Sequence, residues 1–179
     1  MLTLPDYLRR GLDIVFVGIN PGWRSANEGH YFATPRNRFW PAFNAAELTP
    51  TPLGPETDSH ALRYGIGFTD LVKRATRQMA ELKTAEFREG APVLQGKLMD
   101  CQPRVVCFNG VSGYKNYLRF AESTTGAVEI GLQPRQIGRS KVFVVPSTSP
   151  ANAAVSLEEI VATLRELKGL VATLEDGDG

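Results

Sequence analysis

Cysteine and histidine are scarce in this chain of 179 residues. There are two cysteines, Cys101 and Cys107, and two histidines, His30 and His60. Two cysteines cannot build a disulfide framework or hold an iron–sulfur cluster, and the histidines lie far upstream at no metal-ligand spacing. We therefore expect no metal site, and we interpret both cysteines as small core residues.

Long apolar runs are missing as well. No stretch of about 18 apolar residues occurs, as a membrane span would need. The first ten residues contain Asp6 and Arg9-Arg10 instead of the apolar segment of a signal peptide. The sequence therefore predicts a soluble, cytoplasmic protein without a membrane partner. An apolar fraction of 42% together with 17 glycines excludes a disordered chain.

Neither sign of charge dominates, because 20 basic residues face 19 acidic ones and give a net charge of +1. Three of the acids lie in residues 175–179, which we expect to form a disordered tail after a single domain of residues 1–174. Removing these acids leaves the domain at +4. Its basic residues form three clusters that suit phosphate contacts or, equally, a solvated surface: Arg36/Arg38, Lys73/Arg74/Arg77 and Arg135/Arg139/Lys141.

Three short apolar runs rich in β-branched residues predict buried strands, at residues 13–17, 104–108 and 141–145. Runs of this kind are typical of a parallel sheet covered on both faces. Helical patterns cover residues 94–101 and 111–120. Further helices are expected to begin near Asn37, near Thr57, and after a capping box made by Ser156 and Glu159. The sequence therefore predicts an α/β fold, a single-domain three-layer α/β/α sandwich with a mostly parallel central sheet.

In such a sheet, ligands bind beyond the carboxyl ends of the strands, so three segments become candidates for a site. The first is the turn GINPG, Gly18 to Gly22, which lacks the lysine of a phosphate loop and the third glycine of a dinucleotide fingerprint. The second, residues 29–40, interleaves aromatic and basic side chains. The third, residues 146–153, is a hydroxyl-rich loop suited to gripping phosphate. Each segment alone is also explained as an ordinary loop.

Taken together and in this order, GINPG, the segment ending in NRFW, GFTDLV at residues 67–72 and PSTSPANA after the last strand resemble the mismatch-specific uracil-DNA glycosylase and thymine-DNA glycosylase family. The resemblance extends from Asp13 to Leu167. It implies a monomeric, monofunctional glycosylase without a cofactor that flips uracil and related damaged or mismatched bases, notably opposite guanine, out of double-stranded DNA and removes them.

The resemblance also implies roles for particular residues. Asn20 would position the attacking water, while peptide N–H groups near Ile19 and Phe32 would bind uracil oxygens. Phe32 would also stack on the flipped base. The base pocket would comprise Gly18, Ile19, Tyr31 and Phe32, and the DNA-binding loop would comprise Ser147, Thr148, Ser149, Ala151 and Asn152. Small residues, Pro150 to Asn152, stand where relatives carry a bulky or charged wedge.

Asp70 departs from the family pattern, in which lysine or asparagine occupies this place. A carboxylate could accept a proton or bond to the edge of the base, so we name Asp70 a second catalytic candidate. The alternative is that Asp70 caps a helix running from Leu71 to Met79. A strand-nicking glycosylase would need an amine nucleophile, for which Lys73 is the nearest candidate. A nucleotide- or phosphate-binding module, or a DNA-binding protein without chemistry, remains an alternative function.

Overall fold

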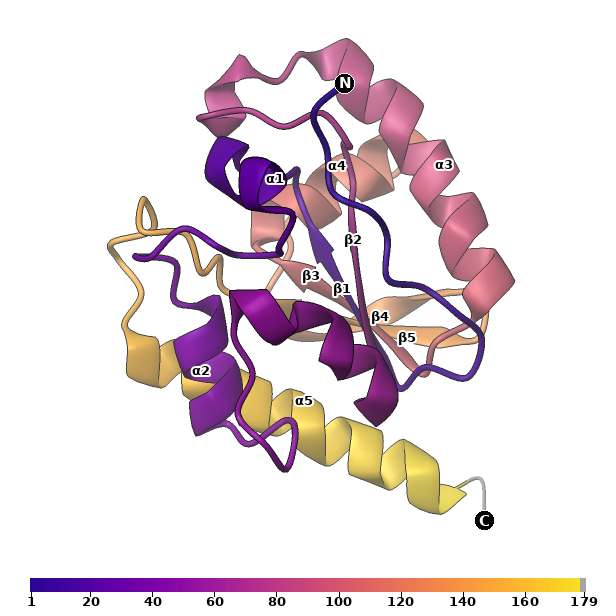
Figure 1. Ribbon diagram of the computed structural model, residues 1–179. Coiled ribbons are helices and arrows are strands. Elements are labelled where there is room, and N and C mark those ends of the chain that lie inside the picture. The colour runs from indigo at the N-terminus through magenta and orange to yellow at the C-terminus, as the bar shows by residue number, and fades with distance from the viewer. Residues whose placement is uncertain (178–179) are drawn as a thin grey trace.

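A five-stranded sheet separates two layers of helices (Figure 1). The computed structural model describes residues 1–177. The strands are β1 (Ile14–Gly18), β2 (Ile66–Asp70), β3 (Val105–Asn109), β4 (Gly131–Ile137) and β5 (Ser140–Val145). Their spatial order is β2-β1-β3-β5-β4, and all neighbours are parallel except the pair β4 and β5. The predicted mostly parallel sheet is thus confirmed.

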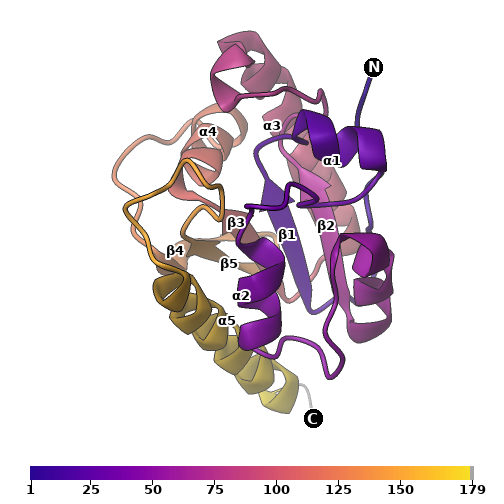
Figure 2. The same ribbon diagram turned by 60° about the vertical axis from the view of Figure 1, so that its left-hand side comes forward.

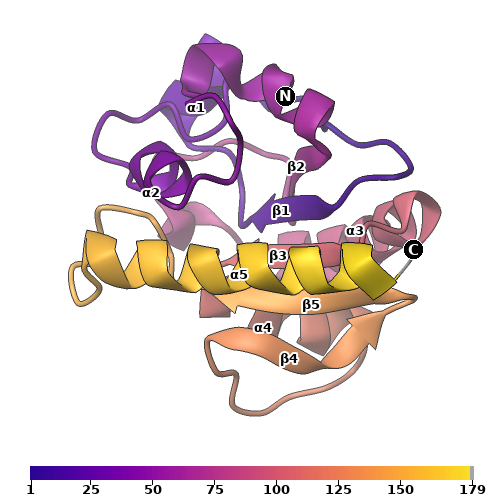
Figure 3. The same cartoon turned by 90° about the horizontal axis from the view of Figure 1, so that it is seen from below.

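Alternate residues of the central strands enter two separate cores. Ile14 and Phe16 of β1 pack with α2 (Phe39–Ala45), the 3₁₀ helix η1 (Pro55–Tyr64) and α5 (Leu157–Gly177). Val15 and Val17 pack with α3 (Thr84–Cys101) and α4 (Val111–Ala121). Figure 3 shows α5 in front of the strands and α4 behind them. Because side chains alternate between the two faces of a strand, continuous apolar runs are what this arrangement requires.

Most predicted elements are present with boundaries shifted by a few residues, except that α3 begins at Thr84, ten residues before the helix predicted over residues 94–101. The last helix begins at Leu157, and the Ser156 hydroxyl accepts a hydrogen bond from the Glu159 amide at 3.2 Å, as the capping box predicts. Cys101 and Cys107 are buried and form no disulfide. The sequence analysis did not identify two strands, β2 and β4, or the short helices α1 (Trp23–Glu28) and η2 (Met79–Glu81).

Two expectations need correction. Residues 71–78 form a loop, so the predicted helix from Leu71 to Met79 is wrong, and Asp70 ends a strand instead of capping a helix. The loop forms because amides of Leu71 and Val72 bond to the Gly18 and Ile19 carbonyls, which extends the β1–β2 pairing. The disorder expected for residues 175–177 of the tail is also wrong, because α5 continues through them. Residues 178 and 179 of that tail lie outside the described residues.

No helix within residues 1–177 has the length and apolar character needed to cross a bilayer.

Candidate active site

The carboxyl ends of β1, β2, β3 and β5 lie at one edge of the sheet, where Gly18 is in register with Asp70 and Asn109 with Val145. All three candidate segments meet this edge. The amide of Arg38, in the second segment, donates to the Thr148 carbonyl of the third at 3.1 Å. Figure 2 shows these two segments side by side beyond the end of α2.

The GINPG turn is fastened to the loop that follows β2. The side-chain nitrogen of Asn20 donates to the Arg74 carbonyl at 2.9 Å, to the Thr76 hydroxyl at 2.8 Å and to the Pro21 carbonyl at 3.2 Å. Because the amide nitrogen is held on this side, the amide oxygen faces the opposite way. Within residues 1–177 nothing donates to that oxygen. Half-buried Asn20 therefore presents an oriented acceptor, as a water-positioning residue must.

Three backbone donors accompany this acceptor. In the described part of the chain, the peptide N–H groups of Ile19, Asn20 and Phe32 have no hydrogen-bond acceptor. Buried or half-buried peptide N–H groups are nearly always paired, so unpaired ones in the segments that follow the strands suit a bound carbonyl oxygen. Phe32 adopts a left-handed conformation, with φ of 53°. This conformation is strained for a bulky residue, and such strain is concentrated at functional sites.

The Phe32 ring is half-buried and rests on an aromatic cluster. It stacks on Phe39 at 4.0 Å between centroids, and Phe39 in turn contacts Phe16 of β1. Tyr31 is buried, with 3% of its surface exposed, and its ring stacks on Phe68 at 5.2 Å. Its hydroxyl donates to the Pro5 carbonyl at 2.7 Å. Tyr31 thus fixes the backbone from which Phe32 projects, and direct contact of Tyr31 with a base stays a prediction.

Asp58 supports this segment from η1 and was not identified from sequence. Its buried carboxylate accepts hydrogen bonds from the Tyr31 amide at 2.8 Å and from the Tyr7 hydroxyl at 3.3 Å. His30 Nδ1 also lies 3.3 Å from it. An Asp in a 3₁₀ helix carries no sequence signal for this contact, because its partner lies 27 residues away.

Asp70 is buried at the end of β2, where its side chain is 4% exposed. One carboxylate oxygen lies 3.5 Å from the Lys73 ammonium, and the other lies against Gly18, where an added Cβ would come within 2.7 Å of it. Burial raises the pKa of Asp70 to about 6, although Lys73 acts in the opposite direction. A buried carboxyl whose pKa lies this close to neutral pH, and which is mostly ionised there, is a suitable proton acceptor.

The loop after β5 is shaped by Asn109, the last residue of β3, which was also missed. The Asn109 amide donates to the Thr148 hydroxyl at 2.9 Å and accepts from the Thr148 backbone N–H at 3.1 Å. Thr148 is only 1% exposed, so in this conformation its side chain organises the loop and does not face solvent. The Ser147 hydroxyl accepts from the Ser149 amide at 3.3 Å and remains half-buried at the edge.

Arg38 holds the same loop from its other side. Its guanidinium donates to the carbonyls of Ser149 at 3.0 Å, Asn152 at 2.9 Å and Val155. The sequence left Arg38 open to phosphate contacts or to a solvated surface, and the structure instead commits it to the protein. Pro150 and Ala151 form the exposed tip of the loop, while Asn152 is tied back to the Ser147 carbonyl at 3.0 Å.

Other basic residues are also paired. Lys73 contacts Asp6 at 2.8 Å, Arg74 contacts Glu86 at 2.6 Å, and Arg135 contacts Glu122 at 2.8 Å. Near the site, the Arg77 guanidinium lies over the Trp23 ring, 5.5 Å from its centroid. Trp23 is 47% exposed and directly follows the GINPG turn. This pair leaves an aromatic and cationic surface beside Asn20.

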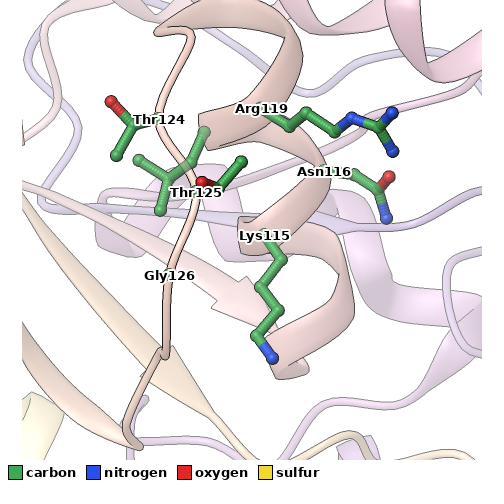
Figure 4. Close-up of a pocket in the computed structure, with 7 residues that line it drawn as sticks. Lys115, Asn116, Arg119, Thr124, Thr125 and Gly126 are labelled. Atoms are coloured by element: carbon green, nitrogen blue, oxygen red, sulfur yellow. The ribbon is translucent and has the colours of Figure 1, made fainter.

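A cavity of about 210 Å³ lies elsewhere, between α4 and residues 124–126. In Figure 4, Lys115 and Arg119 on its rim point away from each other, so no polar groups converge on a ligand there. Within residues 1–177, no three His, Cys, Asp or Glu side chains are grouped as metal ligands would be. The chemistry-bearing side chains gather instead at the edge of the sheet.

The chain also matches a known protein family and the fold of a solved structure. Residues 5–168 match the Uracil DNA glycosylase superfamily. Among solved structures, the chain is similar to a candidate uracil DNA glycosylase from Methanosarcina acetivorans, determined by solution NMR. The TM-score is 0.57 at 24% identity, over 93% of this chain and 97% of the other. This likeness supports the fold.

Proposed function

Because the chain belongs to the uracil DNA glycosylase superfamily, whose members hydrolyse N-glycosyl bonds in DNA, we propose that it removes uracil and related mismatched bases, notably opposite guanine. The base is flipped from double-stranded DNA, and the enzyme acts as a monomer without a cofactor, starting base excision repair. The observation that carries the proposal is Asn20, whose amide nitrogen is held by Arg74 and Thr76 while its oxygen remains free to accept from water.

Hydrolysis breaks the bond between C1′ of the sugar and N1 of uracil, and the bonding electrons leave with the base. The peptide N–H groups of Ile19 and Phe32 are suited to donate to uracil oxygens as negative charge develops on them. Phe32 offers one ring face to the flipped base, because Phe39 covers the other. A water held by Asn20 attacks C1′.

The attacking water must lose a proton, which an amide cannot take at neutral pH. Asp70 is the proton acceptor in this proposal. Its ionised form is populated at neutral pH because its pKa is about 6. The water oxygen forms the new bond to C1′ as its proton passes to the Asp70 carboxylate, so atoms and charge balance.

The loop after β5 would grip the backbone of the distorted strand. The Ser147 and Ser149 hydroxyls accept from the Ser149 and Ala151 amides and keep their own O–H groups for phosphate beside the exposed tip at Ala151, while Thr148 and Asn152 keep the loop in shape. A tip made of Pro150 and Ala151 fills little of the space left by a flipped base. We therefore propose loose discrimination of the base opposite the lesion.

The test is release of uracil from a labelled duplex, read as strand breakage after alkali. Wild type should break the strand, whereas Asn20→Ala should still bind DNA but release uracil orders of magnitude more slowly. Asn27→Ala, which removes an exposed amide of α1, is the matched control and should remain fully active. A wild-type gel shift without breakage would replace the proposed enzyme by a DNA-binding protein. Full activity of Asn20→Ala would exclude Asn20 from the mechanism.

A further inference from the structure

The N-terminal arm, residues 2–7, lies along the outer edge of β2. The backbones of Tyr7 and Phe68 exchange hydrogen bonds of 2.9 and 3.1 Å, and the Ala75 amide donates to the Leu2 carbonyl at 3.0 Å. The contact is close, because a Cβ added to Gly67 would come within 2.2 Å of the Tyr7 carbonyl oxygen. The arm is therefore a fixed part of the sheet edge that carries Asp70.

Asp6 projects from this arm into a cluster of donors. Its carboxylate accepts hydrogen bonds from the Thr69 hydroxyl at 2.7 Å, from Lys73 at 2.8 Å and from Lys97 of α3 at 2.7 Å. Burial opposes ionisation of Asp6, but the bonds from Lys73, Lys97 and Thr69 prevail and lower its pKa. Asp6 is thus a fixed negative charge at neutral pH.

Lys73 is held between two carboxylates. Its ammonium lies 2.8 Å from Asp6 and 3.5 Å from Asp70, and 23% of its side chain is exposed. A flexible lysine would lose considerable rotamer freedom at such a place, and the Asp6 contact compensates for that loss. Lys73 thereby remains close to a carboxyl whose ionisation burial opposes.

Four ionisable groups face Asp70 from four parts of the fold. Lys73 comes from the loop after β2, Asp6 from the N-terminal arm and Lys97 from α3, while the buried Tyr31 hydroxyl comes from the segment after α1. Of these, Lys73 has the largest effect favouring ionised Asp70, and Asp6 acts against it. Burial opposes the ionisation of Asp70 most strongly, and the balance between the nearest cation, Lys73, and the anion Asp6 then adjusts how far Asp70 ionises.

We infer that Lys73, held by Asp6, is a positioning residue for Asp70, and that these two side chains set the pH range in which Asp70 accepts the proton of the attacking water. This inference rests on the proposed function. It makes the N-terminal arm part of the active site, although Asp6 and Asp70 lie far apart in the sequence.

The two partners predict shifts of opposite sign. Lys73→Met removes the nearest cation, so the titration midpoint of Asp70 should rise by about one pH unit. In Asp6→Asn the new amide oxygen still accepts from Lys73 but no longer repels Asp70, so the midpoint should fall. Lys115→Met, which removes an exposed cation on α4, should leave the midpoint unchanged.

The primary measurement is ¹³C NMR titration of the Asp70 carboxyl carbon in the free protein, with the signal assigned by its loss in Asp70→Asn. The acid limb of uracil release under single-turnover conditions should move with this midpoint, and Lys73→Arg should return both toward wild type. If Lys73→Met does not fold, Asp6→Asn carries the test alone, because a downward shift is still required. A merely structural Lys73 would change thermal stability without moving either midpoint.

If the wild type releases uracil but the Asp70 midpoint does not shift in Lys73→Met, or shifts in the same direction in Lys73→Met and Asp6→Asn, this inference is overturned. The proposed function then still stands. A wild-type protein that releases no uracil would overturn the proposed function itself.

Discussion

Replacing Asp70 by asparagine should stabilise the protein at neutral pH. Folding moves this carboxyl from water to a site where 4% of its side chain is exposed, and its pKa rises from the ordinary 3.8 to about 6. Because the pKa of Asp70 is higher in the folded than in the unfolded state, ionisation of this carboxyl lowers the free energy of unfolding. This loss of stability is complete above about pH 6 and absent below about pH 4.

The magnitude follows from the pKa. Each tenfold change in proton affinity corresponds to about 1.4 kcal/mol, so ionised Asp70 costs the folded state about 3 kcal/mol. Asparagine is close to the same size and carries no charge, and Lys73 keeps Asp6 as its partner. At pH 7.5, Asp70→Asn should therefore raise the melting temperature by roughly 6–12 °C for a domain of this size.

The assay is thermal unfolding from pH 4.5 to pH 8, followed by circular dichroism. The gain should shrink steadily as the pH falls, because wild-type Asp70 then becomes protonated. Asp100→Asn makes the same charge change at an exposed position and should have little effect at any pH. Two results would refute the argument that burial disfavours the ionised carboxylate. One is a lower melting temperature for Asp70→Asn at pH 7.5, and the other is a gain in melting temperature that does not depend on pH.

Two further predictions concern residues that hold the site in place. Thr76→Val removes one acceptor of the Asn20 amide and should slow uracil release about tenfold, which corresponds to about 1.4 kcal/mol in the activation free energy. Thr76→Ser keeps the hydroxyl and should retain activity. Equal single-turnover rates for Thr76→Val and wild type would contradict the role of Thr76. Arg38→Met should weaken DNA binding, measured by fluorescence anisotropy, more than it slows the chemical step. Arg38→Lys should only partly restore binding, because a single ammonium nitrogen cannot span the carbonyls that two guanidinium nitrogens reach.

The sequence predicted the central strands well, because β1, β3 and β5 are buried on both faces and leave uninterrupted apolar runs. β4 was missed since it is an edge strand whose pattern contains Pro134 and Arg135, with exposed residues through its middle. β2 was missed because Gly67, Thr69 and Asp70 interrupt its apolar pattern. The N-terminal arm packs against Gly67, Asp6 bonds to Thr69, and the site begins at Asp70. Contacts with distant parts of the chain therefore hold these residues in a strand that their own sequence pattern does not indicate.

The same distinction applies to the site. The sequence analysis selected Asn20, Phe32 and Ser147 as candidates because they follow strands or lie in a recognisable segment. Asn109 and Asp58 were not, since each acts through a partner distant in the sequence, at separations of 39 and 27 residues. A hydrogen bond over such a distance leaves no periodic pattern in one chain, and only the assembled sheet brings its two halves together.

The docked N-terminal arm has a practical consequence for anyone preparing this protein. Residue 2 bonds to Ala75, one residue before the Thr76 that anchors Asn20, whereas α5 ends on the opposite side of the molecule (Figure 1). An affinity tag fused ahead of Met1 would lie beside the loops of the candidate active site and compete with the arm for the edge of β2. A tag appended after residue 179 would leave the contact between the arm and β2 undisturbed. Kinetic comparisons between variants should therefore use C-terminally tagged protein.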